Sequence, residues 1–280
     1  MNELNLKDKV AVITGGAGIL CSLMAKRLAG HGVKTAIIDL NLQAARALAS
    51  EIEKENKIAS IGLFADVLDK DSLEEAREKI NVDLGTVDIL INGAGGNSPS
   101  ATTRVEKMGS SESENIEDTF FGLEMDGFDK AFNLNFKGTL MPAMVFTKDM
   151  VKKKSGSVVN ISSMSSFRPL TRIAAYSAAK AAVNNFTQWL AVHFAKTGVR
   201  VNAIAPGFLL TDQNRFLLVD AKTGGLTTRG KKIINCTPLE RYGTPEELIG
   251  TLLYLVSDWS EFVTGVIIPV DGGFNAYSGV

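Results

Sequence analysis

The 280-residue chain has little of what several kinds of site require. It contains two cysteines, Cys21 and Cys236, and two histidines, His31 and His193. Two cysteines so far apart provide no disulfide framework, so we expect a reducing, cytoplasmic setting. So few histidines also argue against a histidine-based metal site, and we expect no metal.

Long apolar runs and an excess of charge of one sign are also missing. No apolar run approaches the roughly 18 residues that a membrane helix needs, and the first residues, MNELNLKDK, lack the apolar core of a signal peptide. The 30 basic residues nearly balance the 31 acidic ones, for a net charge of −1. We therefore expect no broad electrostatic binding of nucleic acid or of an anionic membrane. A hydrophobic fraction of 45% is typical of a globular protein.

Short apolar runs alternate with stretches of helical periodicity along most of the chain. The runs predict strands at residues 9–14, 33–39, 58–65, 87–91, 157–161, 199–204 and 265–270, with helices at 19–30, 42–56 and 72–82. Strands that alternate with helices imply βαβ crossovers and a parallel sheet covered on both faces. The strands lack polar alternation, as expected when both faces are buried. The fold class is therefore α/β, with one doubly wound domain over residues 1–280.

Two stretches interrupt this alternation. Residues 95–127 are polar and rich in serine and glutamate, and residues 209–238 carry mixed charge and a Gly-Gly pair. Long irregular segments within a compact domain are usually lids or binding loops. We interpret both as loop insertions of the single domain.

The first predicted strand ends in a glycine-rich turn, Thr14-Gly15-Gly16-Ala17-Gly18, which leads directly into a helix at Ile19. Glycines let the backbone turn tightly and approach a phosphate, and the helix N-terminus offers unpaired N–H groups. A plain strand-to-helix turn is the alternative. The βαβ context favours a dinucleotide site that involves Gly15, Gly16, Gly18 and Ile19.

Polar and small residues follow the next three strands. Asp39 closes the second strand, where a carboxylate can accept hydrogen bonds from the adenosine ribose and would repel a 2′-phosphate; this favours NAD over NADP. Alternatively, Asp39 or Asn41 caps the next helix. Asp66 and Val67 are expected to hold the adenine, and Asn92, Ala94 and Gly95 to pass close under the cofactor. All these positions follow carboxyl ends of strands, where open α/β sheets bind ligands.

A possible catalytic group lies further along the chain. Tyr176 and Lys180 are spaced i and i+4, so they share one face of a helix. An ammonium beside a phenol lowers the phenol pKa, which suits proton exchange with an alcohol. Ser163, at the end of a strand, can hold a carbonyl oxygen where negative charge develops, and Asn135 completes a polar relay behind the lysine. Alone, the Tyr-Lys pair is often just a surface pair.

Taken together, these motifs resemble the short-chain dehydrogenase/reductase family over essentially the whole chain. The matching pieces are TGGAG at 14–18, NGAG at 92–95, NFKG at 135–138, Ser163, Tyr176 with Lys180, PGFLLT at 206–211 and DGG at 271–273. The resemblance implies a seven-stranded Rossmann-like sheet and an NAD-dependent exchange between a hydroxyl and a ketone. It also implies a homotetramer.

The resemblance also implies roles for single residues. Tyr176 would be the general acid/base, and Lys180 would bind the nicotinamide ribose and lower the tyrosine pKa. Ser163 would position the substrate oxygen, and Asn135 would hold a water for proton relay. Pro206 and Gly207 would line the nicotinamide face, with Thr211 near the nicotinamide or pyrophosphate.

One departure from the family pattern concerns the glycine turn. The last two glycines of the usual TGxxxGxG motif are replaced by Ile19 and Cys21. This departure motivates an alternative from another class, a nucleotide-sensing protein without catalysis, although Ser163, Tyr176 and Lys180 argue against it. We interpret Cys21 as a small buried residue rather than a redox-sensitive thiol.

The substrate is expected to be polar. Asn97, Arg168, Arg172, Gln213, Asn214 and Arg215 lie near the expected site. Arginine pairs with a carboxylate through two parallel hydrogen bonds, and Arg168 is the best candidate because it follows Ser163 closely; a solvated surface charge is the alternative for each arginine. We expect Asn97, Gln213 and Asn214 to contact substrate as well.

Longer runs resemble the D-mannonate oxidoreductase, or fructuronate reductase, subgroup. They include NGAGGN at 92–97, FRPLT at 167–171, NNFTQWLAVHF at 184–194 and GFNAYSGV at 273–280. This resemblance implies reversible oxidation of a sugar-acid hydroxyl. Gluconate 5-dehydrogenases and other keto-sugar-acid reductases share the framework and remain alternatives, as does a 3-oxoacyl thioester reductase, against which the polar loops and Asp39 weigh.

Overall fold

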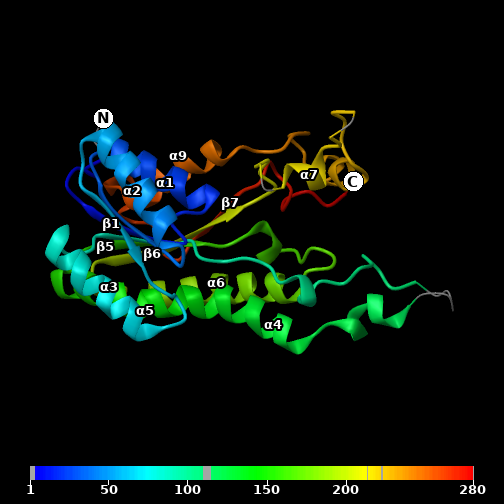
Figure 1. Ribbon diagram of the computed structural model, residues 1–280, viewed down its shortest axis with the longest axis horizontal. Coiled ribbons are helices and arrows are strands. Elements are labelled where there is room, and N and C mark those ends of the chain that lie inside the picture. Colours follow the sequence, from blue (N-terminus) through cyan, green and yellow to red (C-terminus); the bar gives the residue numbers. More distant parts are fainter. Residues whose placement is uncertain (1–3, 110–114, 213, 222, 280) are drawn as a thin grey trace.

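A parallel β-sheet forms the centre of the molecule (Figure 1). The computed structural model describes residues 4–109, 115–212, 214–221 and 223–279, and these ranges contain seven strands in the order β3-β2-β1-β4-β5-β6-β7. The strands are β1 (Val10–Thr14), β2 (Lys34–Asp39), β3 (Ser60–Phe64), β4 (Ile89–Asn92), β5 (Gly156–Ile161), β6 (Val199–Pro206) and β7 (Ile267–Val270). Every pairing is parallel. The predicted α/β class is confirmed.

Helices cover both faces of the sheet. The α-helices of the described ranges are α1 (Ile19–Gly30), α2 (Leu42–Asn56), α3 (Lys70–Asp83), α4 (Met125–Phe132), α5 (Gly138–Lys153), α6 (Ala174–His193), α7 (Arg215–Leu218), α8 (Thr228–Asn235) and α9 (Ile249–Val256). Figure 1 shows α1, α2 and α9 on one side of the sheet and α3, α5 and α6 on the other. Each set buries its own apolar cluster against the strands. The result is the doubly wound arrangement of a Rossmann-like fold.

The strand order places a crevice at the middle of the sheet. The chain moves outward from β1 to β3, then returns to the other side of β1 and continues from β4 to β7. Helices that follow β1 and β4 therefore lie on opposite faces, and the loops after these two strands separate. The carboxyl ends of β1 and β4 are thus where this architecture forms a ligand site.

The helices that follow β2 and β3 are capped by side chains, whereas α1 is not. The Asn41 side chain accepts a hydrogen bond from Ala44 N at 3.1 Å, and Asp69 accepts one from Asp71 N at 3.0 Å. The N-cap of α1 is Gly18, and no side chain bonds there. The first N–H groups of α1 therefore face the crevice without a side-chain acceptor.

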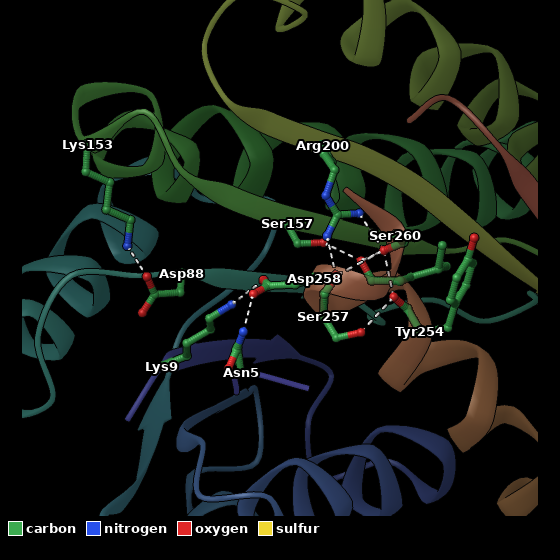
Figure 2. Close-up of polar contacts among 11 residues, drawn as sticks. Asn5, Lys9, Asp88, Lys153, Ser157, Arg200, Tyr254, Ser257, Asp258 and Ser260 are labelled. Atoms are coloured by element: carbon green, nitrogen blue, oxygen red, sulfur yellow. Dashed lines mark hydrogen bonds and ion pairs between the residues drawn. The ribbon is translucent and has the colours of Figure 1, made fainter. Parts of the chain in front are cut away.

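The opposite, amino-terminal edge of the sheet is held by internal polar contacts (Figure 2). Lys153 pairs with Asp88, whose carboxylate also accepts a hydrogen bond from Val10 N at 2.8 Å. The Arg200 guanidinium donates to Ser260 Oγ at 2.9 Å and to the Ser257 carbonyl at 3.1 Å. A cavity of about 500 Å³ lies at this edge. Its charged groups bond to the protein itself, so this edge has a structural role.

The two predicted insertions contain short regular segments. The described part of residues 95–127 contains three short 3₁₀ turns and leads into α4 at Met125, whereas the described part of residues 209–238 contains α7 and α8. The N-terminal half of the first insertion lies beside the turn that precedes α6, because Thr103 N donates to the Arg172 carbonyl at 3.0 Å.

The described residues contain no helix long and apolar enough to span a membrane. They also contain no group of three or more His, Cys, Asp or Glu side chains placed to hold a metal ion.

Candidate active site

A cavity of about 510 Å³ lies at the carboxyl ends of the central strands. Loops after β1, β4, β5 and β6 line it, together with the first turns of α1 and α6. Of the predicted site residues, those in the lining are Gly15, Gly18, Ile19, Asp39, Ala94, Gly95, Ser163, Tyr176, Lys180, Pro206, Gly207, Thr211 and Asn214. The sequence motifs after four different strands therefore meet in one cavity.

The glycine turn after β1 lies against the loop after β4. Gly15 has a φ of +59°, and a Cβ on it would lie 2.9 Å from Ala94 Cα. Gly16 lies behind the cavity lining, where its N–H donates to the Ile38 carbonyl at 3.0 Å and a Cβ would lie 2.8 Å from Ile37 Cγ2. The glycines thus allow a tight turn that leads into the uncapped N-terminus of α1. This cradle fits the pyrophosphate of a dinucleotide.

Cys21 explains how the turn tolerates the loss of a family glycine. The side chain is buried, and a Cβ on Gly93 would lie 2.1 Å from Cys21 Sγ. The sulfur therefore occupies the space that Gly93 leaves empty. Burial raises the pKa of the thiol to about 12, so Cys21 is a neutral, poorly reactive thiol, as the sequence predicts.

Asp39 lies at the rim of the cavity with its carboxylate fixed. One oxygen accepts a hydrogen bond from Ala17 N at 3.2 Å and the other from Asn41 N at 3.0 Å. The cap of α2 is Asn41, so the alternative role as that cap does not apply to Asp39. Its position fits the ribose of a bound adenosine.

Besides Gly16, three predicted cofactor residues lie outside the cavity lining. Asn92 is buried, and its amide donates to Asn160 Oδ1 at 2.8 Å, so its side chain ties β4 to β5 instead of reaching a cofactor. Val67 is buried against the position of Gly138. The Asp66 carboxylate accepts a hydrogen bond from Leu68 N at 2.8 Å. The Asn92 side chain therefore holds the sheet together, and only the backbone of this segment is left to pass under a cofactor, as predicted for residues 92–95.

The predicted catalytic side chains converge on the cavity. Ser163 follows β5, and Tyr176 and Lys180 lie on successive turns of α6. Lys180 Nζ donates to the Ile161 carbonyl at 2.7 Å and lies 5.7 Å from the centre of the Tyr176 ring. Ser163 Oγ accepts hydrogen bonds from Ser165 N at 3.2 Å and from Ser165 Oγ at 3.0 Å. These contacts fix the hydroxyl and the ammonium near the phenol.

Burial controls the charges of this group. It raises the pKa of the Tyr176 phenol, and a hydrogen bond with Ser163 opposes that rise, so the lowered tyrosine pKa that the sequence predicts is corrected to a raised one. It also lowers the pKa of Lys180 from 10.5 to about 8. Perturbed titratable groups that share a cleft are typical of catalytic sites.

Asn135 lies directly behind Lys180, in a π-helical turn, Asn133–Lys137. Its side-chain oxygen accepts a hydrogen bond from Gly96 N at 3.2 Å, and its amide donates to the Gly96 carbonyl at 2.6 Å and to the Ala131 carbonyl at 2.7 Å. A Cβ on Gly95 would lie 2.6 Å from Asn135 Oδ1 and 3.2 Å from Lys180 Nζ. Asn135 therefore holds the loop after β4 against the lysine.

The predicted substrate residues are placed less uniformly. Arg168 Nη1 donates to the Tyr277 carbonyl at 2.5 Å, and Asn97 donates to Thr102 Oγ1 at 2.8 Å. Asn214 lines the cavity, but its Oδ1 accepts a hydrogen bond from Thr211 N and its Nδ2 donates one to the Leu209 carbonyl. Gln213 lies outside the described residues. Arg168, Asn97 and Asn214 therefore hold loops and the C-terminal segment, and their contact with substrate stays a prediction.

Comparison with known proteins agrees with this geometry. A sequence model of the family described as short chain dehydrogenase matches residues 9–220. The chain belongs to the short-chain dehydrogenase family. The protein is thus an oxidoreductase of the alcohol and ketone type, and the alternative of a non-catalytic nucleotide sensor is not supported.

Relatives of this enzyme extend over its whole length. An uncharacterized oxidoreductase of Bacillus subtilis (strain 168) is 51% identical over 99% of this chain and 98% of its own. A Haemophilus protein, solved with bound NAD and to which D-mannonate oxidoreductase activity is ascribed, is 50% identical, with a TM-score of 0.94 over 99% of this chain and 98% of that one. The 5-keto-D-gluconate 5-reductase of Escherichia coli (strain K12) is 31% identical over 98% of each chain. Sugar-acid oxidoreductases are thus prominent among its relatives.

The enzyme has further polar residues behind the site that sequence reasoning missed. Asn184 donates to Ser166 Oγ at 2.7 Å and accepts a hydrogen bond from Ser162 Oγ at 2.5 Å, and Ser166 Oγ donates to the Ser163 carbonyl at 2.5 Å. Asn184 continues the i, i+4 spacing of Tyr176 and Lys180 on the same face of α6. That spacing was the signal that could have found it.

Proposed function

We propose that this enzyme interconverts a hydroxyl and a ketone on a sugar acid with NAD(H), with D-mannonate and D-fructuronate as the substrate pair. The observation that carries this assignment is the likeness, at 50% identity over 99% of the chain, to the Haemophilus protein to which D-mannonate oxidoreductase activity is ascribed. The convergence of Ser163, Tyr176 and Lys180 in the cavity supports the reaction type.

The residues of the cavity suit the cofactor proposed. The glycine turn, the uncapped start of α1 and the small residues Ala94 and Gly95 leave room for a dinucleotide, which supplies or accepts a hydride when it is bound. The fixed Asp39 carboxylate would accept hydrogen bonds from the ribose hydroxyls and repel a 2′-phosphate, so the cofactor proposed is NAD. Gly207 and Pro206 would lie against the nicotinamide, with Thr211 beside them. Gly15, Gly18 and Ile19 would surround the pyrophosphate, with Gly16 supporting the turn. The adenine end would lie toward Asp66 and Val67.

The protein groups would then handle the proton. In the reductive direction, Ser163 Oγ holds the substrate carbonyl oxygen, and Tyr176 Oη protonates it as negative charge develops there. Lys180 favours the phenolate that remains, because its ammonium lies beside the ring. Asn135 keeps the loop after β4 in place behind this group. The proton on Tyr176 is restored from solvent along the side of Lys180.

A second candidate is the reduction of 5-ketogluconate. The Escherichia coli 5-keto-D-gluconate 5-reductase supports it, since its match covers 98% of each chain. The same catalytic residues would serve both substrates, so the two candidates differ only at the substrate end of the cavity.

We propose that the enzyme works as a cytoplasmic homotetramer. The cytoplasmic assignment rests on its thiols: Cys21 and Cys236 are both free. The assembly is supported by apolar side chains that α5 and α6 leave exposed, among them Met144, Trp189 and Val192.

The substrate assignment is tested by NADH oxidation with D-fructuronate, D-tagaturonate, 5-keto-D-gluconate and a 3-oxoacyl thioester, each repeated with NADPH. We expect turnover with D-fructuronate and NADH to exceed the others, with D-mannonate as the product. Preference for 5-keto-D-gluconate would transfer the assignment to the second candidate. Preference for the thioester would contradict the sugar-acid class.

A further inference from the structure

Arg172 lies in the loop between β5 and α6, outside the cavity lining. It comes two residues before α6 begins and four residues before Tyr176, whose side chain lines the cavity. Its φ is +77°, a left-handed conformation that a long side chain rarely adopts. Such a backbone persists only where its surroundings hold it, and these conformations gather at ligand sites.

Contacts with the first insertion hold Arg172 in this conformation. Thr103 N donates to the Arg172 carbonyl at 3.0 Å, and Arg172 Nε donates to the Thr103 carbonyl at 2.7 Å. Within the described residues, the terminal nitrogens Nη1 and Nη2 have no hydrogen-bond partner. The guanidinium is therefore anchored through Nε, while the two-pronged end that binds carboxylates stays available.

Two further cations, Arg229 and Lys232, lie on α8 in the second insertion. Lys232 on α8 donates to Glu106 Oε2 at 2.8 Å, which joins the two insertions. The pKa of Glu106 is lowered first by this hydrogen bond and the Lys232 charge, and further by the charges of Arg172 and Arg229. Arg172, Arg229 and Lys232 thus all act electrostatically on the Glu106 carboxylate.

We propose that Arg172 binds the carboxylate of the sugar-acid substrate, and that Arg229 and Lys232 on α8 attract that carboxylate to the mouth of the cavity. This inference rests on the proposed function. It assigns the carboxylate to Arg172 instead of Arg168, whose guanidinium donates to the Tyr277 carbonyl in the C-terminal segment. The strained backbone and the Thr103 contacts fix the guanidinium before substrate arrives, which reduces the ordering that binding requires.

Calorimetric titration into the complex with NADH tests the inference without turnover. The titrants are D-mannonate, D-altronate and D-gluconate, each compared with its neutral alditol, in which a hydroxymethyl group replaces the carboxylate. We expect the wild type to bind at least one of these aldonates about tenfold or more tightly than the alditol. Arg172→Ala should lose this preference, and Arg172→Lys should retain part of it because the charge remains without the fork.

Arg104→Ala is the matched control, since Arg104 lies in the same insertion, is largely exposed and pairs with Asp118. It should keep the wild-type preference, and unchanged NADH affinity should show that each variant is folded. The inference is overturned if the wild type shows no preference, if Arg172→Ala keeps it, or if only Arg168→Ala removes it.

The same titration separates this inference from the proposed function. An Arg172-dependent preference in an enzyme that reduces none of the keto-sugar acids would leave the carboxylate site standing and overturn the assigned reaction.

Discussion

Lys180 shows how a single buried residue combines a chemical function with a cost in stability. Its ammonium must be buried to lie beside the Tyr176 ring, and that burial opposes its charge. Asp39 is a second case, because its two oxygens are held by backbone N–H groups that orient the carboxylate before any ligand arrives. Such residues trade local stability for a fixed arrangement of charge.

The buried ammonium predicts a rise in stability at alkaline pH. Lys180 titrates at about 8 in the folded protein and at 10.5 in the unfolded chain, so the unfolded chain binds more protons between these values. The free energy of unfolding should therefore increase with pH across this window. Relative to Lys180→Met, the wild type without dinucleotide should gain about 1–3 kcal/mol from about pH 8 to about pH 10 in urea titrations. A difference that stays flat with pH would mean that Lys180 keeps its ordinary pKa.

The fixed carboxylate predicts the choice of cofactor. Asp39→Ser removes the charge that repels a 2′-phosphate, so kcat/KM should fall about 10- to 100-fold with NADH and rise with NADPH. Asn41→Ala is the control, since Asn41 caps α2 and its loss should lower stability by about 1 kcal/mol without changing cofactor preference. An unchanged preference in Asp39→Ser would remove the ribose role.

At the scale of elements, the sequence predicted most of the first half of the fold. The bounds of α1 and α2 agree with the helices predicted at 19–30 and 42–56, because the glycine turn before α1 and the Asn41 cap of α2 are local signals. Strands β1, β2 and β3 lie within the runs predicted at 9–14, 33–39 and 58–65 but are shorter, since the end residues of a buried run do not always pair. Residues 128–156 were left unassigned, although α5 lies there with Pro142 inside it, a residue that usually ends a helix. The short helices α7 and α8 also escaped prediction, although the Thr227 side chain caps α8 by accepting a hydrogen bond from Gly230 N.

The catalytic group could be predicted because local spacing in the sequence determines it, whereas the substrate end of the cavity depends on partners that local spacing does not show. Tyr176 and Lys180 lie on one helix, and Ser163 follows one strand, so local spacing fixes them. Arg168 and Asn97 instead bond to Tyr277 and Thr102, and Asn92 bonds to Asn160 of another strand. Tyr277 and Asn160 lie far along the chain from Arg168 and Asn92, and no local pattern records such partners.

The contact between the turn after β1 and the loop after β4 predicts an energetic coupling. Gly93→Ala would bring a Cβ to 2.1 Å from Cys21 Sγ and 2.9 Å from the Thr14 carbonyl, so we expect a loss of about 1–3 kcal/mol. Cys21→Ala removes the first clash only. The double variant should therefore recover part of the loss, which a double-mutant cycle from urea unfolding measures. Simple additivity of the two losses would show that the sulfur does not fill the space above Gly93.

At the scale of the whole molecule, the sheet separates two functions. The carboxyl ends of the strands carry the cavity and its insertions, whereas the amino-terminal ends are held by internal pairs such as Lys153 with Asp88 (Figure 2). The face formed by α5 and α6 lies away from both edges and exposes apolar side chains. An exposed apolar face of this kind fits a contact between subunits.

That face predicts how assembly responds to a charge. Val192 on α6 is 78% exposed and Val82 on α3 is 84% exposed, so the two valines form a matched pair. Val192→Lys should shift the mass in light scattering from that of a tetramer of 30.0 kDa subunits to a smaller species. Val82→Lys should leave the mass unchanged. Equal masses for wild type and Val192→Lys would exclude this face from the assembly.

The most direct test of the account compares NADH oxidation with D-fructuronate by the wild type and by Tyr176→Phe. Phenylalanine fills the same space without the hydroxyl that protonates the substrate oxygen, so the turnover number should fall at least about 100-fold while the Kd for NADH stays within about twofold. Near-normal turnover by Tyr176→Phe would contradict the central claim that this phenol exchanges the proton.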